Sequence, residues 1–378
     1  MNSDTIKLGV DEFTLVLQYS VDKPDIREWE YLCEDIISEF LNKSFIPDVF
    51  ECELVNADGK KPAGYTECLT LPDDKPFYLA IAWNPLMPTM GVILKFSAYA
   101  WAEYQHRFEK KYETSINVAD FLQFTDSEFY SSRLSRIDIT LDYYNYFDES
   151  FLSELYNRMV QEKTIQLIDK NHRVNVHKYN AVLSGEIINT LYCGSRGANT
   201  RSFLRIYNKK REQEETFGFR LNEAQNHNSW FRFEASFRSI YAHDISRHLK
   251  LISSQEEYHN YLKDVFLEKY RFFDKKKEAY CPWTDALIPE DTTILRCESP
   301  RNNSLKQSIE NLLNNSGLFS TVAKVGLIFG EEAEDKFWNF LKKAYQRDRS
   351  YLINKKELQI WAKKNKEISR DDLAEYFK

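Results

Sequence analysis

Residues 136–142 read Arg-Ile-Asp-Ile-Thr-Leu-Asp, so that polar and aliphatic side chains alternate. Because alternate side chains of a β-strand share a face, this pattern predicts a strand whose polar face carries Asp138 and Asp142. Aspartate is depleted in strands, and two carboxylates on one face are unusual. They are hard oxygen ligands of the kind that Mg²⁺ or Mn²⁺ prefers, although a solvated strand face explains them as well.

Residues 230–238 show the same alternation, in the order Trp-Phe-Arg-Phe-Glu-Ala-Ser-Phe-Arg. Phenylalanine and alanine form one face of the predicted strand, and Arg232, Glu234 and Arg238 lie on the other. Glu234 is therefore a third candidate metal ligand. A surface strand in which Glu234 pairs with neighbouring arginines is the alternative.

The third segment, residues 201–211, is basic and contains a tyrosine between two cations: Arg205, Tyr207 and Lys209 share one face of the predicted strand. Tyrosine has an ordinary pKa of about 10 and is a poor nucleophile at neutral pH. The two cations would favour the phenolate form of Tyr207, and they could also hold a phosphate. Because the sequence has 23 tyrosines, a core tyrosine with its hydroxyl at the surface is an equally open interpretation.

Together, a divalent cation and an activated tyrosine suit transesterification of a phosphodiester. The cation neutralises charge on the phosphate while the phenolate attacks it. The formal charge of the chain is −7, but residues 196–250 carry 11 Lys or Arg against 6 Asp or Glu, and residues 301–378 carry 15 against 11. A DNA backbone would need such local positive charge.

Four motifs resemble the replication initiation factors of the Rep_trans class, which include rolling-circle initiators of Gram-positive plasmids and relaxases of integrative conjugative elements. The resemblance covers residues 130–240. The motifs are Ser-Arg-Ile-Asp-Ile-Thr-Leu-Asp (135–142), Thr-Leu-Tyr-Cys-Gly-Ser-Arg (190–196), Phe-Leu-Arg-Ile-Tyr-Asn-Lys (203–209) and Arg-Phe-Glu (232–234).

This resemblance implies that Tyr207, and not Tyr192, nicks one DNA strand at a replication or transfer origin and keeps its 5′ phosphate. It implies Mg²⁺ or Mn²⁺ as the cofactor, held by Asp138, Glu234 and Asp142. Arg205 and Lys209 would act beside Tyr207. The expected contacts to DNA phosphates come from Arg196, Arg201, Lys210, Arg232 and Arg238. The implied partners are origin DNA, either supercoiled or as a single-stranded nick site, a second copy of the chain in a homodimer, and a helicase of the host or the element.

Two other functions stay open on the sequence: a non-catalytic protein that binds an origin, and a metal nuclease that activates water and leaves no protein–DNA adduct. No histidines have the His-hydrophobic-His spacing of other nickases, and the chain has no P-loop. No signal peptide, no apolar run of ~20 residues and no Cys-x-x-Cys pair occurs. We therefore expect a cytoplasmic protein with reduced thiols and no membrane segment.

Strand and helix patterns alternate irregularly, which favours an α+β fold with a largely antiparallel central sheet and flanking helices. We expect a catalytic domain at 1–278, a proline-containing connector at 279–301 and a smaller all-helical C-terminal domain at 302–378, which is either a packing cap or a second DNA-contacting domain. Strands are predicted at 7–18, 78–83, 92–96, 135–144, 190–193, 203–207 and 230–237. Helices are predicted at 25–41, 98–112, 148–161, 253–273, 304–313, 321–328, 331–347, 355–364 and 369–377.

Overall fold

The computed structural model describes residues 6–19, 24–59, 61–75, 78–185, 187–197, 200–288 and 317–354, with Leu305, Ile309, Leu312, Leu313 and Ala362 as isolated positions. The chain divides into two compact units. The first contains Met1–Val21, Glu34–Trp83 and Val92–Cys297, and the second contains Asp22–Cys33, Asn84–Gly91 and Glu298–Lys378. The predicted domain boundaries at 278 and 302 stay predictions.

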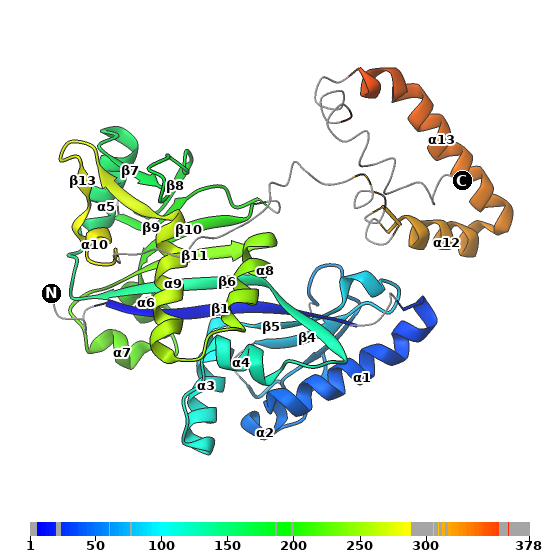
Figure 1. Cartoon of the computed structure of the whole chain (residues 1–378), viewed down its shortest axis with the longest axis horizontal. Helices are drawn as coiled ribbons and strands as arrows, with labels where there is room; N and C mark the ends of the chain where they lie inside the picture. Colours follow the sequence, from blue (N-terminus) through cyan, green and yellow to red (C-terminus); the bar gives the residue numbers. More distant parts are fainter. Residues whose placement is uncertain are drawn as a thin grey trace. The chain divides into compact units, whose positions relative to one another are not determined.

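An antiparallel sheet of ten strands forms the frame of the first unit (Figure 1). Every neighbouring pair of strands in it is antiparallel, so the predicted α+β fold with an antiparallel sheet is confirmed. In spatial order the strands are β2 (Val55–Asn56), β3 (Glu67–Thr70), β4 (Leu79–Trp83), β5 (Val92–Phe96), β1 (Ile6–Tyr19), β6 (Tyr130–Tyr144), β11 (Trp230–Arg238), β10 (Ser202–Asn208), β9 (Ile187–Cys193) and β8 (Tyr179–Ser184).

The two faces of the central strands differ as their alternation predicts. Ile137, Ile139 and Phe233 are at most 1% exposed and belong to the apolar face. Helices cover parts of the sheet, and α8 and α9 lie across its central strands (Figure 1). The helices of this unit are α2 (Ile46–Phe50), α3 (Ala98–Tyr112), α4 (Val118–Phe124), α5 (Phe151–Tyr156), α6 (Lys209–Thr216), α7 (Leu221–Gln225), α8 (Ile240–Leu249), α9 (Gln255–Lys269) and α10 (Pro282–Asp285).

A β-bulge interrupts β1 where it passes the middle of β6. Val10 pairs with Ile139 and Phe13 pairs with Ile137, so Asp11 and Glu12 together stand opposite the single residue between them on β6. Phe13 turns to the apolar side, where its ring meets that of Trp101 at a centroid distance of 5.0 Å. The bulge thus places two consecutive acidic residues beside the polar face of the sheet while the strand keeps its core contact.

The start of α3 lies next to this bulge. Strand β5 ends at Phe96, which pairs with Phe13 of β1. Ser97 then caps α3, because its side chain accepts a hydrogen bond from the amide of Ala100 at 3.2 Å. The chain therefore leaves the sheet and begins a helix beside Asp11 and Glu12.

Several predicted elements differ from the observed ones. The predicted helix 253–273 ends at Lys269, and β12 (Arg271–Asp274) follows, because its backbone pairs with β7 (Ile165–Ile168) and β13 (Ala279–Tyr280) in a second sheet. The predicted helix 148–161 begins at Phe151 and ends in a π-helical turn, Asn157–Gln161. The predicted connector contains α10.

The second unit contains a 3₁₀ turn, Pro88–Met90, and the helices α12 (Leu318–Phe329) and α13 (Glu331–Ile353). Helix α1 (Ile26–Ser44) runs through the division between the units. Gly330 separates α12 from α13 with a φ of 86°, in the left-handed region that glycine adopts readily. The predicted helices 321–328 and 331–347 are confirmed within α12 and α13. The predicted helices 304–313, apart from isolated positions, 355–364, apart from Ala362, and 369–377 lie outside the described residues.

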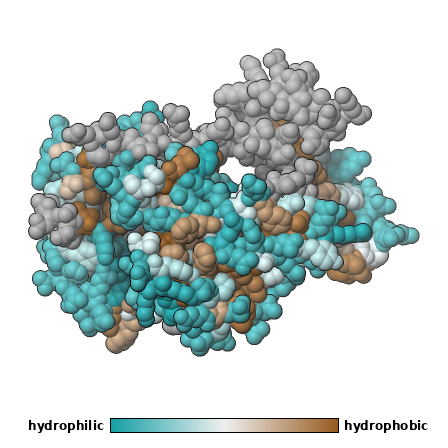
Figure 2. Space-filling view, turned by 60° about the horizontal axis from the view of Figure 1, so that its bottom comes forward, coloured by the Kyte–Doolittle hydropathy of each residue, from teal (hydrophilic) through white to brown (hydrophobic). Residues whose placement is uncertain are grey.

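No described helix has the length and apolar character needed to cross a membrane. The face of the molecule in Figure 2 is largely hydrophilic, and its hydrophobic residues form separate small patches. In the described part of the chain Cys33, Cys52, Cys68, Cys193 and Cys281 form no disulfide.

Candidate active site

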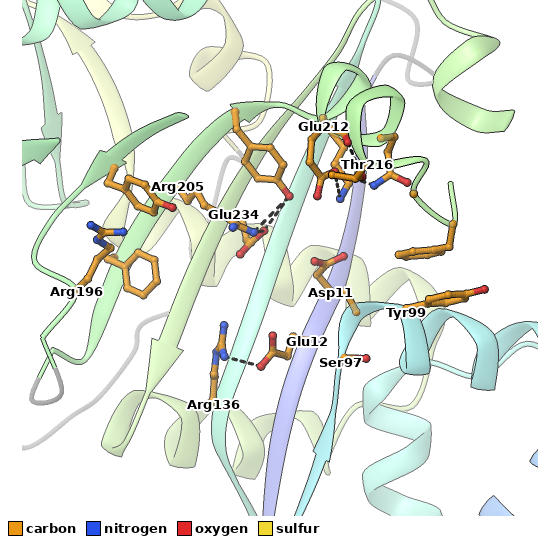
Figure 3. Close-up of a pocket in the computed structure, with 18 residues that line it drawn as sticks. Asp11, Glu12, Ser97, Tyr99, Arg136, Arg196, Arg205, Glu212, Thr216 and Glu234 are labelled. Atoms are coloured by element: carbon orange, nitrogen blue, oxygen red, sulfur yellow. Dashed lines mark hydrogen bonds and ion pairs between the residues drawn. The ribbon is translucent and has the colours of Figure 1, made fainter. Parts of the chain in front are cut away.

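A pocket of about 550 Å³ lies on the polar face of the sheet, beside the bulge of β1 and the start of α3 (Figure 3). Its walls come from β1, α3, β6, β9, β10, α6 and β11, together with the loop that follows α6. The lining residues are Asp11, Glu12, Ser97, Ala98, Tyr99, Arg136, Tyr192, Arg196, Phe203, Arg205, Tyr207, Lys209, Glu212, Gln213, Thr216, Gly218, Phe219 and Glu234.

Tyr207, Glu234 and Arg205 form the hydrogen-bonded centre of this pocket. In the register between β10 and β11, Arg205 stands opposite Glu234. The Tyr207 hydroxyl donates to Glu234 Oε2 at 3.1 Å, and the Arg205 guanidinium donates to the same oxygen at 2.5 Å. Arg205 also lies 3.5 Å from the Tyr207 hydroxyl and over its ring, 4.5 Å from the ring centroid. A phenol, a carboxylate and a guanidinium are therefore within reach of one another.

The electrostatics of Tyr207 differ from the expectation based on its basic neighbours. Burial raises the pKa of the Tyr207 hydroxyl well above its ordinary value, and the charge of Glu234 raises it further. Arg232 and Arg205 oppose this rise without cancelling it. Tyr207 is thus a neutral phenol at neutral pH, and the predicted phenolate is wrong because the sequence pattern did not reveal burial. An attack by this oxygen needs a base to accept its proton.

Glu234 meets the requirements of such a base. Burial raises the pKa of its carboxyl, while the charge of Arg205 opposes the rise. A carboxylate with a raised pKa holds a proton more readily, and it already accepts the hydrogen bond of the Tyr207 hydroxyl. The hydrogen bond therefore places Glu234 where it can accept a proton from Tyr207.

A second group of charges lies at the bulge. Arg136 donates to Asp138 Oδ1 at 3.0 Å and to Asp138 Oδ2 at 2.5 Å, and it also donates to Glu12 at 2.5 Å. Burial raises the pKa of Asp138, although Arg136 opposes this. Burial also disfavours the ionised form of Asp11, but the charges of Arg232 and Lys209 outweigh it and lower the pKa of Asp11.

Asp142 and Arg232 form a buried ion pair. Arg232 donates to both carboxylate oxygens of Asp142, at 2.7 and 2.8 Å, and to Asp11 at 2.6 Å. The indole of Trp230 donates to Asp142 at 2.7 Å. Arg232 is 1% exposed and Asp142 is 4% exposed. These contacts favour a structural role for both residues, so neither the predicted metal contact of Asp142 nor the predicted phosphate contact of Arg232 gains support.

Residues 132–317, which contain β6, β10, β11 and the Tyr207–Glu234 pair, match the family model described as "Replication initiation factor". This part of the chain is similar to the replication initiation factors. The match confirms the resemblance that the four motifs indicate. No curated protein sequence matches the chain.

The structure of this chain is similar to a solved structure titled as the rolling circle replication initiator protein from Geobacillus stearothermophilus. The two chains are 17% identical, with a TM-score of 0.49, and the match covers 75% of this chain and 95% of the other.

The predicted site residues fall into two groups. Tyr207, Arg205, Lys209, Arg196 and Glu234 line the pocket. Lys209, at the first position of α6, is 4% exposed and pairs with Glu212 at 2.8 Å. Its pKa is lowered by burial and by the charge of Arg232.

The remaining predicted phosphate contacts do not line the pocket. The guanidinium of Arg201 lies 5.9 Å from the ring centroid of Tyr241, and that of Arg238 lies 5.0 Å from the ring centroid of Phe203. Lys210 donates to the carbonyl of His227 at 2.7 Å.

A divalent cation fits only part of the predicted ligand set. Asp142 fits it least, because three donors from Arg232 and Trp230 already occupy its two oxygens, whereas Asp138 accepts two hydrogen bonds, both from Arg136. Asp138 and Glu234 are carboxylates whose pKa is raised by burial against the opposing charges of Arg136 and Arg205, so an additional cation would stabilise their ionised forms. Among the described residues, no three His, Cys, Asp or Glu side chains are grouped as metal ligands. The cofactor stays a prediction.

Sequence reasoning missed several residues that line the pocket. Asp11 and Glu12 carried a usable signal, because two adjacent acids interrupt the apolar alternation of the first strand. Tyr99 and Phe219 carried none, since a helix start and a loop meet there only in the folded chain. Arg136 was part of the polar strand face, but no role was predicted for it.

Proposed function

We propose that this replication initiation factor is a site-specific DNA nickase and strand-joining enzyme that starts rolling-circle replication or mobilisation of a genetic element such as a plasmid. The observation that carries the proposal is the hydrogen bond from the Tyr207 hydroxyl to Glu234, inside a pocket with Arg205 and Arg196 on its wall. The family match supports the coarser part, replication initiation. The substrate is origin DNA.

In the proposed reaction Glu234 accepts the proton of the Tyr207 hydroxyl as the phenol oxygen attacks the scissile phosphorus. A bond forms between that oxygen and phosphorus, and the bond from phosphorus to the 3′-oxygen breaks. The 3′-oxygen takes up a proton from water and becomes a free hydroxyl that can prime synthesis. The 5′ phosphate stays on Tyr207. The reverse reaction, in which a 3′-hydroxyl attacks the phosphotyrosine, joins strands.

Arg205 is the proposed phosphate ligand at the point of attack. Its Nε is buried and has no hydrogen-bond partner among the described residues, which leaves a donor for a phosphate oxygen. Arg196 stacks on the Tyr192 ring with its guanidinium 4.1 Å from the ring centroid, and both residues line the pocket. These two arginines would hold the scissile strand against Tyr207, and Lys209 would add positive charge beside its ring, at 5.6 Å.

A divalent cation, Mg²⁺ or Mn²⁺, is proposed with Asp138 and Glu234 as its protein ligands. When bound, such an ion would neutralise charge that builds up on the phosphate. Glu234 cannot bind the cation through the same oxygen that accepts the proton of Tyr207. Asp138 is therefore the ligand whose role is easiest to test alone.

The test uses supercoiled plasmid DNA that carries the cognate origin, with Mg²⁺ or Mn²⁺. The native chain is expected to nick one strand and to become covalently linked to the 5′ end, which sequencing of the trapped DNA end identifies. Tyr207→Phe keeps the ring but is expected to lose both nicking and adduct. Tyr179→Phe removes a hydroxyl on β8, outside the pocket, and should keep both.

The alternatives give different results in this assay. A non-catalytic origin-binding protein binds the plasmid and leaves it supercoiled. A nuclease that activates water nicks without an adduct, and its Tyr207→Phe variant still cleaves. Either result would overturn the proposed mechanism. A homodimer and a helicase partner are further proposals that rest on the family resemblance alone.

A further inference from the structure

A stacked aromatic pair lies at the wall of the same pocket. The rings of Tyr99 and Phe219 are nearly parallel, at 5°, and their centroids are 4.4 Å apart. Tyr99 comes from the first turn of α3, and Phe219 from the loop between α6 and α7. Figure 3 shows Tyr99 and Arg196 on opposite sides of the view, with Glu234 between them. The pair is therefore part of the surface that a strand bound at Tyr207 would meet.

The loop that carries Phe219 is held in place by a buried glutamine. Gln213 is 2% exposed, and its side-chain Oε1 accepts a hydrogen bond from the amide of Arg220 at 2.8 Å. Its carbonyl accepts one from the amide of Gly218 at 2.9 Å. A Cβ on Gly218 would lie 2.3 Å from Gln213 Oε1, so glycine permits this close approach. Phe219 stands between two residues fixed in this way.

The side chain of Phe219 stays 37% exposed, even though the loop that carries it is held in place. The rest of the pocket wall is mostly charged or polar, so the pair is an apolar, π-rich area beside a charged centre. Unpaired nucleotides have this combination of properties: a charged phosphate and a flat base. Aromatic side chains bind single strands by stacking on bases, and rigid placement lowers the entropy cost of doing so.

We infer that Tyr99 and Phe219 are a base-stacking platform for single-stranded DNA, which takes an unpaired base close to the scissile phosphate. The inference rests on the proposed function, because it assumes that DNA is the ligand of this pocket. It adds that the bound strand is unpaired there, and that recognition by the platform tolerates any base, since every base has a π face.

The experiment measures binding without cleavage. The full chain with Tyr207→Phe is titrated against a fluorescein-labelled strand of 20 thymidines and against an abasic strand of the same length, by fluorescence anisotropy at constant salt. Phe219→Ala and Phe219→Leu are compared with Phe217→Ala. Phe217 is 83% exposed on the same loop and does not line the pocket, so it is a matched control.

Loss of one stacking contact is expected to raise the Kd for the thymidine strand by about 5- to 100-fold in both Phe219 variants. The Kd for the abasic strand should not change, and Phe217→Ala should bind both strands as the parent does. Phe219→Leu keeps an apolar side chain in the loop, so its result does not depend on whether the alanine variant is fully folded.

Three results would overturn the inference: an unchanged Kd for the thymidine strand in both Phe219 variants, an equal loss for the abasic strand, or a parent chain that binds neither strand. These outcomes are separate from those for the nickase. If the native chain forms no adduct but the Phe219 variants lose base-dependent binding, the proposed chemistry fails and the platform stands.

Discussion

The Tyr207 hydroxyl donates a hydrogen bond to a carboxylate oxygen of Glu234, 3.1 Å away, across the pairing of β10 with β11. The sequence motifs predicted both residues but placed them in different roles, nucleophile and metal ligand. Their contact joins the two roles, because a buried phenol cannot attack a phosphate until its proton has an acceptor.

Substitution of Glu234, the proposed proton acceptor, should lower the nicking rate without lowering the affinity for DNA. In Glu234→Gln the side chain keeps its size but loses its basicity. Nicking should fall by a factor on the order of 10²–10⁴, the usual contribution of a general base. Binding of single-stranded DNA should remain. The measurement is a single-turnover nicking assay beside an anisotropy titration.

A matched control for this variant is Glu215→Gln. Glu215 is an exposed residue of α6 that pairs with Arg211 at 2.6 Å and does not line the pocket. It should nick at the rate of the native chain. Full nicking by Glu234→Gln would remove Glu234 from the proton transfer.

The raised pKa of Glu234 predicts a pH dependence. A base must be ionised, so the nicking rate should rise with pH through a value above the ordinary 4.5 of a glutamate, and Glu234→Gln should lack this rise. The raised pKa of Glu234 affects the free energy of unfolding in the opposite direction. A carboxyl with a raised pKa in the folded state stabilises the fold less as pH rises through that pKa. Urea denaturation should therefore show the free energy of unfolding of Glu234→Gln improving relative to the native chain as pH increases.

Arg232 should contribute more to the stability of the fold than to the binding of DNA. Arg232→Gln leaves the carboxylates of Asp142 and Asp11 buried without their cation, which should lower the free energy of unfolding by about 3–5 kcal/mol. Arg201→Gln, whose residue is part-exposed, should change it by no more than about 0.5 kcal/mol. If Arg232→Gln stays stable and instead loses DNA binding, the phosphate contact predicted from the sequence is right.

The metal proposal predicts different effects for substitutions of the two aspartates of β6, Asp138 and Asp142. Chelation with EDTA should stop nicking. Asp138→Asn should raise the Mn²⁺ concentration for half-maximal nicking by at least about tenfold. Asp142→Asn should lower the stability of the fold and leave the Mn²⁺ requirement unchanged, because its oxygens already bind Arg232 and Trp230. The opposite pattern would make Asp142 the ligand.

The strands that carry the candidate site were predictable because their alternation has a period of two. Arg205 and Tyr207, or Asp138 and Asp142, can be placed on one face from spacing alone. Strand neighbours were not predictable in this way. Nothing in the spacing of residues 136–142 shows that β6 lies between β1 and β11, since that order depends on chain segments far apart in sequence.

Burial was the other quantity that the sequence did not reveal. The positive neighbours of Tyr207 suggested a lowered pKa, whereas the folded chain encloses the ring and raises it. Burial also turned Arg232, a predicted phosphate ligand, into part of an internal ion pair. Both findings have one cause: a polar strand face can itself lie beneath other elements.

The order of strands in the sheet has a consequence for biosynthesis. Asp11 and Arg232 form an ion pair although 221 positions separate them in the chain. Strand β1 pairs with β6, and β6 pairs with β11, so the walls of the pocket are complete only after all three strands have been synthesised. Pairings between such distant segments form slowly. A nascent chain on the ribosome therefore lacks the complete pocket until well over half of its length has been translated.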